Sequence, residues 1–332
     1  MTYFLGMDGG GSKTIAVVAD AEGDVLGVGR SGGINFQEIG VRAARAELAL
    51  AHRRALRVAG VRPAATAAAG YGICGADRDK DYATVMDMII GFDASPLRVL
   101  VNDTSIALRA GTPDGVGVAC ISGTGVNVMG FNREGRFKRV GGLGPLSADW
   151  GGGTDIAVAA VNAAMKQAEG RGPNTLLHDL ILERFGLDDI EDMIELGFCD
   201  VGREDAIAAV TPLAFRAAAM GDAVAHDILV RAGSSIGKAA RFVINDLFAP
   251  GEPVTVALGG SVFMRGRPPV PADALARVVK TARNPVKIIK LRTEPAVGGV
   301  LLAMDGHYGR TTPKAVAERI ACTLNEHIRT PT

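Results

Sequence analysis

The sequence has only four cysteines among its 332 residues, and none of them forms a C-x-x-C pair. Cys74, Cys120, Cys199 and Cys322 lie far apart, so no local zinc knuckle or dithiol motif is visible. Cysteines spread in this way are typical of proteins in a reducing compartment, where they serve as small apolar residues.

The chain also lacks an excess of either charge and any apolar run as long as a membrane span. Lys and Arg together number 36, as do Asp and Glu, so the net charge of zero indicates neither a nucleic-acid nor an anionic membrane partner. A local basic patch is still compatible with this total. The first residues show neither the basic flank nor the apolar core of a signal peptide. We expect a cytoplasmic protein that binds no nucleic acid and no membrane.

Glycine, by contrast, is abundant, and it follows short apolar runs. Residues 3–7 and 14–19 are apolar on either side of a glycine-rich turn, which predicts strand, turn and strand. The same plan recurs at residues 116–121 and 126–131. At one constant offset the two segments pair Gly11 with Gly123, Glu22 with Glu134, Gly23 with Gly135 and Gly29 with Gly141. We interpret this as a duplication that gives two related domains facing each other.

Helical and strand patterns alternate along the remaining chain, which predicts α/β layers. Helices are expected at residues 41–59, 81–91, 154–167, 205–219 and 222–248, and strands at 65–70, 97–101 and 255–258. The length favours two domains, which we place at 1–111 and 112–304, followed by a helix within 305–332.

That last helix carries an apolar stripe at intervals of four residues, formed by Val316, Ile320, Leu324 and Ile328. The stripe predicts packing on the N-terminal domain or on a partner subunit. Together with the Ala-rich helices, it suggests a homodimer.

The first glycine-rich loop has the composition of a phosphate site: Asp8-Gly9-Gly10-Gly11-Ser12-Lys13-Thr14. Its glycines let the backbone N–H groups approach an anion, while the lysine and the hydroxyls add donors. A strand rather than a helix follows, so this is not the strand-to-helix phosphate loop. Asp8 would hold a hydrated magnesium ion near the phosphates. The alternative is a plain glycine-rich hairpin with a solvent-facing Asp8.

Two later segments repeat the sequence of strand and then glycine. Ser122-Gly123-Thr124-Gly125 offers a second set of backbone N–H groups, and two such loops in duplicated domains suggest a phosphate chain held between them. Leu258-Gly259-Gly260-Ser261 would admit a nucleotide base or ribose close to the backbone.

Asp103 follows a predicted buried strand at its carboxyl end, where open α/β sheets bind their ligands. A carboxylate there could accept the proton of an attacking hydroxyl in phosphoryl transfer. The alternative is an N-cap for the next helix, and the two roles are compatible.

A long irregular stretch then opens the helix expected at residue 154. It contains Gly141 and Gly142, the carboxylate of Asp149, and Trp150, the only tryptophan. Its glycine density suggests a ligand loop. A helix cap for Asp149 and simple packing for Trp150 are the alternatives.

Taken in order, these motifs resemble those of the acetate kinase/sugar kinase/Hsp70/actin superfamily over residues 3–304. They are most similar to the group that joins N-acetylglucosamine kinases, bacterial glucosamine kinases and the BadF/BadG/BcrA/BcrD ATPases. The likeness rests on residues 8–14, Asn102-Asp103, residues 121–125 with Asn127, Gly141-Gly142 before Asp149, and Leu258-Gly259-Gly260.

This resemblance implies two ribonuclease H-like domains with an interdomain cleft that closes over ATP, Mg²⁺ and a small-molecule sugar. Residues 8–14 and 122–125 would bind phosphate, and Gly259, Gly260 and Ser261 would bind adenosine. Asp103 would be the general base toward a sugar hydroxyl, with the 6-OH expected. Substrate contacts are implied for Asn35, Asn127 and Asp149.

The chain departs from the N-acetylglucosamine kinases at two places, which leaves its sugar open. Leu143 replaces the Trp that typically follows the paired glycines, and Ala148-Asp149-Trp150-Gly151 replaces Gly-Asp-Glu-Gly. We expect an ATP-dependent kinase of N-acetylglucosamine or glucosamine.

Other members of the superfamily provide alternatives. A dehydratase-activating ATPase would need cysteine ligands for an iron–sulfur cluster, and Cys120 is not in such a context. An ATP-regulated switch protein would keep the phosphate loops without needing Asp103 as a base. A sugar-responsive repressor would need a DNA-binding extension, for which we expect no room before the first strand.

Overall fold

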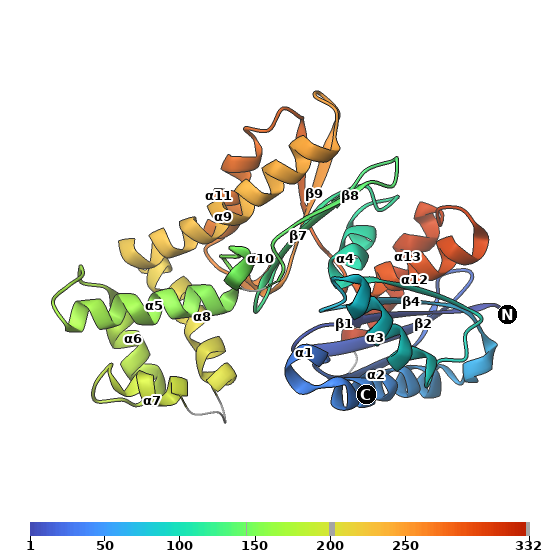
Figure 1. The fold of residues 1–332 in the computed structure, drawn as a ribbon, viewed down its shortest axis with the longest axis horizontal. Coiled ribbons are helices and arrows are strands. Elements are labelled where there is room, and N and C mark those ends of the chain that lie inside the picture. The colour runs from blue at the N-terminus through green and yellow to red at the C-terminus, as the bar shows by residue number, and fades with distance from the viewer. Residues whose placement is uncertain (144, 199–202, 330–332) are drawn as a thin grey trace. The chain divides into compact units, whose positions relative to one another are not determined.

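The computed structural model describes residues 1–143, 145–198 and 203–329 and contains two compact units (Figure 1). One unit consists of Met1–Ala119, Gly130–Gly135 and Leu291–Thr332, and the other of Cys120–Met129 and Arg136–Lys290. The C-terminal boundary differs from the expected division at residue 304. Residues 291–304 belong with the first unit because the helix that they enter packs on the first sheet.

The first unit is built on a five-stranded sheet of order β3-β2-β1-β4-β5. Strands β1 to β3 are antiparallel, whereas β4 and β5 run parallel to β1. Its elements are β1 (Tyr3–Gly9), β2 (Lys13–Asp20), β3 (Val25–Gly32), α1 (Phe36–Ile39), α2 (Val41–Ala59), β4 (Thr66–Ile73), α3 (Asp79–Ile90), β5 (Leu97–Asn102), α4 (Asp103–Gly111), α12 (Ala296–Tyr308) and α13 (Lys314–Arg329).

The pleat of β1 sends alternate side chains into two different cores. Leu5 and Met7 pack with α2 and α3 on one face, whereas Phe4 packs with α12 and α13 on the other. Glycine allows both layers to approach closely: a Cβ on Gly6 would lie 2.2 Å from the backbone N of α12, and one on Gly29 would lie 2.0 Å from a carbonyl O of α2. The sheet therefore lies between two helical layers.

The C-terminal helix α13 packs on the sheet of its own unit. Ile320 and Leu324 are fully buried in the core that also contains Val25. Arg319 pairs with Asp24 at 2.6 Å. The apolar stripe is thus covered by the N-terminal unit, the first of the two expected partners, and the homodimer stays a prediction.

The second sheet has the order β10-β9-β6-β7-β8. Read from the other end, the first sheet has the order β5-β4-β1-β2-β3, so β6 to β10 take the places of β1 to β5 one for one. Gly23 and Gly135 lie in equivalent turns, and both have positive φ, 93° and 74°. The shared topology supports the duplication inferred from the constant offset. The strands are β6 (Gly117–Ser122), β7 (Val126–Phe131), β8 (Phe137–Val140), β9 (Val254–Gly259) and β10 (Val286–Lys290).

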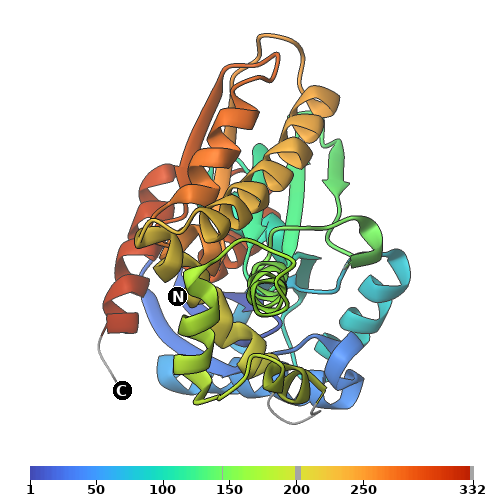
Figure 2. The same ribbon diagram turned by 90° about the vertical axis from the view of Figure 1, so that its left-hand side faces the viewer.

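Helices α9 and α11 lie side by side in the second unit, and α5 to α8 form a helical part with its own core (Figures 1 and 2). The helices are α5 (Gly153–Ala168), α6 (Leu176–Phe185), α7 (Asp192–Phe198), α8 (Arg203–Ala219), α9 (Ala223–Leu247), α10 (Ser261–Arg265) and α11 (Val270–Val279). Within the described residues, no single helix meets the length and hydropathy of a membrane span, although the bent pair Ala206–Ala219 and Ala223–Leu247 meets them jointly.

Candidate active site

Two carboxylates of the first unit lie where parallel strands end. Asp8 is at the end of β1, on the same face as Phe4 and Gly6, the face that α12 covers. Asp103 is the first residue of α4, directly after β5. Because β1, β4 and β5 are parallel, their carboxyl ends meet at one edge of the sheet, which brings the two side chains into one site.

The electrostatics of this site distinguish the two carboxyl groups. The pKa of Asp8 is raised to about 8, first by burial and then by the negative charge of Asp103, while Lys13 acts to lower it. The pKa of Asp103 is raised to about 6, mainly by burial, against the lowering effect of the Thr104 backbone N–H. A carboxyl group with a pKa near 6 is ionised at neutral pH and is a stronger base than an ordinary aspartate.

The cap of α4 is Asn102. Its side chain accepts the backbone N–H of Thr104 at 2.9 Å, and Asp103 Oδ1 accepts the same N–H, also at 2.9 Å. Asn102 Nδ2 donates to Asp77 at 3.0 Å, and the negative charge of Asp77 raises the pKa of Asp103. The start of α4 is therefore capped by Asn102 and does not depend on Asp103 alone. Asp77, which contacts Asn102 and acts on the pKa of Asp103, is a site residue that the sequence analysis missed.

Glu294 is a second residue of the site that the sequence analysis missed. Its Oε2 lies 2.8 Å from Nζ of Lys13, and its negative charge contributes to the raised pKa of Asp8. The residue precedes Pro295 and the start of α12, which packs on β1. The sequence offered one signal for this residue, a carboxylate directly before a helix that begins after a proline and contains glycines. Because 281 residues separate Glu294 from Lys13, the sequence did not indicate that the two side chains meet.

The first glycine loop is the tight turn between β1 and β2. Gly10 N–H donates to the Lys13 carbonyl at 2.9 Å, and Gly11, Ser12 and Lys13 are exposed. No atom lies within 4 Å of the position that a Cβ would take on Gly11. The backbone at this turn is thus open to a ligand. Thr14, in contrast, is buried, and its hydroxyl donates to a carbonyl of β3 at 2.8 Å.

The turn after β4 connects this loop with Asn35. Gly9 accepts the N–H of Cys74 at 2.8 Å, and burial with the surrounding carboxylates raises the pKa of the Cys74 thiol. Asn35 caps α1 by accepting the Gln37 N–H at 3.3 Å, and its Oδ1 would lie 3.4 Å from a Cβ on Gly75. The structure therefore places Asn35 in the same unit as Asp103.

In the second unit, Ser122 to Gly125 form the turn between β6 and β7. The carbonyl of Gly123 accepts the Gly153 N–H at 2.7 Å, which ties the loop to the start of α5, and that of Thr124 accepts the next N–H at 3.1 Å. The Ser122 hydroxyl is buried and donates to a backbone carbonyl at 2.8 Å. Space in front of Gly123 and Gly125 is open, with no atom within 4 Å of either Cβ position.

The predicted adenosine motif lies against this loop. Gly259 ends β9, Gly260 follows with φ of 84°, and the exposed Ser261 begins α10. A Cβ on Gly260 would lie 2.2 Å from the Ser122 carbonyl O. Both the dihedral angle and the contact require glycine, so the two segments are held together through this position.

The paired glycines bring Asn127 and Asp149 together. Gly141 and Gly142 have φ of 71° and 78°, and their Cβ positions are filled by side-chain oxygens of Asp149 and Asn127 respectively. Asp149 Oδ2 accepts the Gly142 N–H at 2.8 Å and the Leu143 N–H at 3.1 Å. This carboxylate organises the loop, and the side chain of Leu143 is exposed beside it.

Two residues beside Asp149 differ from the family pattern. Ala148 has φ of 61°, the one positive value among the described non-glycine residues. Trp150 packs on the helical core of this unit, with the Arg231 guanidinium 4.0 Å from its ring centroid. Its ring thus serves packing, the alternative considered from sequence. Cys120 is buried in β6, and burial raises its pKa to about 12, so it is a packing residue here.

Two sheets of the same strand order, each with a glycine turn after its first strand, define the ribonuclease H-like fold of the actin-like ATPases. The chain belongs to the BadF/BadG/BcrA/BcrD ATPase family, whose model matches residues 5–303. The expected family and fold class are both confirmed.

Two curated relatives match over almost their whole length. The N-acetyl-D-glucosamine kinase of Dictyostelium discoideum is 29% identical, over 91% of this chain and 98% of that protein. The N-acetylmuramic acid/N-acetylglucosamine kinase of Clostridium acetobutylicum is 30% identical, again over 91% of this chain and 98% of that protein. A protein structure from Chromobacterium violaceum has the same fold, with a TM-score of 0.69 at 21% identity, over 90% of this chain and 98% of that chain.

Proposed function

We propose that the protein transfers the γ-phosphoryl group of ATP to a hydroxyl of an amino sugar, N-acetylglucosamine or glucosamine, with the 6-OH as acceptor. Two sugar kinases that match over nearly their full length support this reaction class, as does a glucosamine kinase that matches over 78% of its length. The observation that carries it is Asp103: a carboxylate with a pKa of about 6, at the carboxyl end of β5.

In this mechanism Asp103 accepts the proton of the attacking sugar hydroxyl. Its raised pKa makes it a better proton acceptor than an ordinary aspartate, while it remains mostly ionised at pH 7. The Thr104 N–H fixes the orientation of the carboxylate. Positioning and electrostatic stabilisation supply most of the catalysis in phosphoryl transfer, so a single well-placed base suffices.

The open backbone turns are the proposed phosphate ligands. Gly10, Gly11, Ser12 and Lys13 of the first unit, with Gly9 and Thr14 shaping the hairpin, would bind phosphate, as would Gly123, Thr124 and Gly125 after Ser122 in the second. Gly259, Gly260 and Ser261 are proposed to contact adenosine, and Asn35, Asn127 and Asp149 to contact the sugar. Asn127 and Asp149 already lie around one pair of glycines.

The residues present fit a hydrated magnesium ion. Asp8 is a carboxylate whose negative charge is disfavoured by burial and by Asp103, and a cation would relieve both effects. Carboxylate oxygens with water are the ligands that Mg²⁺ prefers. Bound there through water, the ion would offset the charge of the nucleotide phosphates.

The test is ATP turnover with magnesium against N-acetylglucosamine, glucosamine, N-acetylmuramate, glucose and no sugar. We expect ADP release stimulated by one amino sugar, with the matching sugar phosphate formed. Asp103→Asn should lower kcat by at least about a hundredfold with little change in nucleotide affinity, because general-base catalysis contributes that much. Asp87→Asn, an exposed change on α3, is the control.

Two results would contradict this assignment. Sugar-independent hydrolysis by the parent protein would favour an ATP-regulated switch protein. Equal loss of nucleotide binding and turnover in Asp103→Asn would show that Asp103 supports the site instead of acting as the base.

A further inference from the structure

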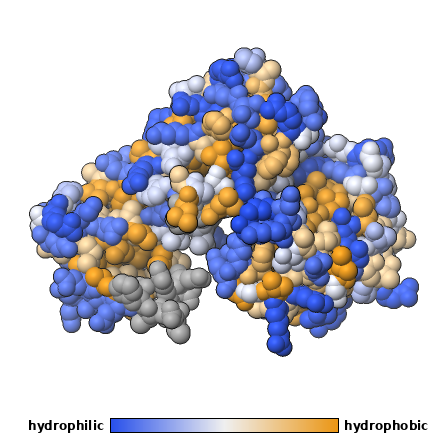
Figure 3. Space-filling view, in the orientation of Figure 1, coloured by the Kyte–Doolittle hydropathy of each residue, from blue (hydrophilic) through white to orange (hydrophobic). Residues whose placement is uncertain are grey.

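A separate charged feature of the first unit lies along α2. This helix carries one acidic residue, Glu47, whose carboxylate accepts a backbone N–H of β3 at 2.7 Å. It also carries five arginines: Arg42, Arg45, Arg53, Arg54 and Arg57. The neutral total charge of the chain therefore conceals a strongly basic helix. In the space-filling view, hydrophilic and hydrophobic residues are interleaved over this unit (Figure 3).

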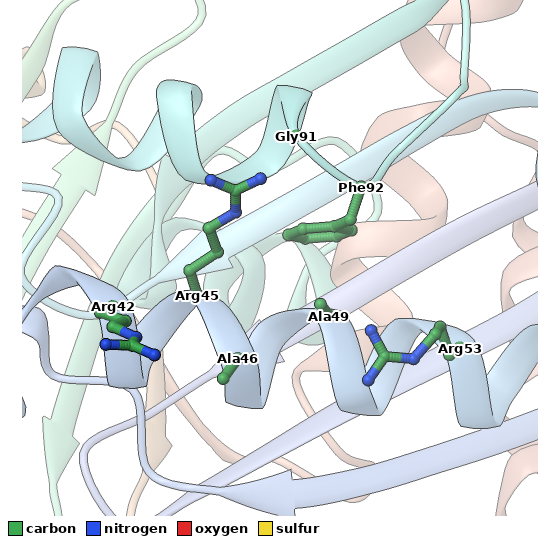
Figure 4. Close-up of a pocket in the computed structure, with 7 residues that line it drawn as sticks. All are labelled: Arg42, Arg45, Ala46, Ala49, Arg53, Gly91 and Phe92. Carbon is green, nitrogen blue, oxygen red and sulfur yellow. The ribbon is translucent and has the colours of Figure 1, made fainter.

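Three of these arginines surround a hollow of about 380 Å³ between α2 and the end of α3. Arg42, Arg45 and Arg53 line it together with Gly91 and Phe92. Figure 4 shows Arg45 reaching from α2 toward Gly91, the Phe92 ring beside it, and Arg42 and Arg53 on either side along the helix. A hollow of this size has room for a small organic anion.

The arginines of the hollow have no acidic partner among the described residues. Other arginines of the same unit do: Arg98 pairs with Asp93 at 3.0 Å, and Arg109 pairs with Asp305 at 2.8 Å. Three unpaired guanidinium groups that line one hollow create a positive potential that favours an anion. Guanidinium groups also match the geometry of phosphate oxygens.

The wall opposite α2 is shaped to receive Arg45. A Cβ on Gly91 would lie 2.0 Å from Nη2 of Arg45, so a side chain at this position would push the guanidinium out of its present place. The Phe92 ring is fixed from behind by an edge contact with the buried His52 ring, at a centroid distance of 5.1 Å. One wall is thus rigid and aromatic, which suits the apolar face of an organic ligand.

From this geometry we infer a second ligand site, in which Arg42, Arg45 and Arg53 bind the phosphate group of a small phosphate ester and Phe92 contacts its organic part. The shared chemistry is the phosphate dianion, which a sugar phosphate or free inorganic phosphate would supply. The site lies in the first unit alone and does not depend on the kinase reaction.

Isothermal titration calorimetry on the full chain tests this site with glucosamine 6-phosphate and inorganic phosphate as separate probes. Arg42→Gln combined with Arg45→Gln should weaken binding by about a hundredfold, since each lost charged hydrogen bond costs roughly tenfold. Arg57→Gln combined with Arg62→Gln removes the same charge from exposed positions outside this hollow and should leave binding unchanged. Tighter binding of the ester than of free phosphate would identify the ester as the ligand class, and equal binding would identify phosphate itself.

A second variant separates geometry from charge. Gly91 has an ordinary helical φ of −71°, so Gly91→Ala should fold normally while its methyl group displaces the Arg45 guanidinium. Weaker binding with all arginines present would support the site. No binding by the parent protein, binding that survives in the Arg42/Arg45 variant, or an equal loss in the Arg57/Arg62 control would overturn it.

Discussion

Replacing Asp8 by Asn should stabilise the ligand-free protein, and the gain should grow with pH. Burial and the charge of Asp103 raise the pKa of Asp8 from an ordinary 3.8 to about 8. A carboxyl group with a higher pKa in the folded chain holds its proton more tightly when folded. Its favourable contribution is therefore complete below about pH 4 and is lost as the pH rises through about 8. Asparagine has no such proton to lose.

The magnitude follows from the size of the pKa shift. Between about pH 4 and 8 the difference in free energy of unfolding between Asp8→Asn and the parent should widen by about 1.4 kcal/mol per pH unit. It should level off above that range at roughly 6 kcal/mol. This is a large fraction of the stability of an ordinary domain.

The aromatic residues allow each unit to be followed separately during urea unfolding. The four tyrosines, Tyr3, Tyr71, Tyr82 and Tyr308, lie in the first unit, and Trp150, the only tryptophan, lies in the second. The pH-dependent gain should appear in the tyrosine signal between pH 5 and 9. Asp87→Asn, an exposed change on α3, should leave the pH dependence as in the parent. A difference between Asp8→Asn and the parent that is constant with pH would refute the reasoning.

Two further predictions concern side chains beside the proposed ligands. Glu294→Gln frees Lys13 from its pair and removes a negative charge, so affinity for a non-hydrolysable ATP analogue should rise by up to about fivefold, the value of a partly exposed ion pair. Calorimetry would measure the affinity. As a control, Glu318→Gln breaks the exposed pair with Lys314 and should leave the affinity unchanged. Weaker binding of the ATP analogue by Glu294→Gln would instead show that Glu294 positions Lys13. Ala148→Gly should raise the free energy of unfolding of the second unit by about 1 kcal/mol, because alanine is strained at φ of 61°. Tryptophan fluorescence during urea unfolding would measure the gain, and an unchanged or lower stability would argue that the loop does not hold this conformation in solution.

Sequence patterns were sufficient for the parts of the site that are local. Glycine turns between apolar runs predicted both loops, and the constant offset predicted two sheets of one topology, because strand and turn preferences act over a few residues. The end of a strand predicted the place of Asp103, although β5 was expected to be buried and is instead an edge strand that is only partly buried before Asn102. Even so, the sequence offered Asp103 as a possible N-cap, whereas the cap residue of α4 is Asn102; side-chain orientation, which the sequence does not specify, decides this.

Contacts between distant segments were beyond sequence reasoning. Glu294 reaches Lys13 only because α12 returns to the first sheet, and that return also displaces the expected boundary at residue 304. The contacts of Gly141 and Gly142 with the side chains of Asp149 and Asn127, which fill their Cβ positions, were likewise not visible in the sequence. Such packing follows from tertiary structure and leaves no periodic trace in the chain.

The charge balance of the first unit gives a physical reason for the proposed dependence on magnesium. Four carboxyl groups influence one another or share partners: those of Asp8, Asp77, Asp103 and Glu294. Among the described residues, Lys13 is the cation that acts on Asp8. When all four carboxyl groups are ionised, this set carries an excess of negative charge, and a nucleotide triphosphate would add more. Since like charges in a buried site are costly, nucleotide binding requires either proton uptake by Asp8 or a cation beside it. Proton uptake by Asp8 becomes unfavourable above its pKa of about 8, so the magnesium dependence of nucleotide affinity should be steepest at alkaline pH.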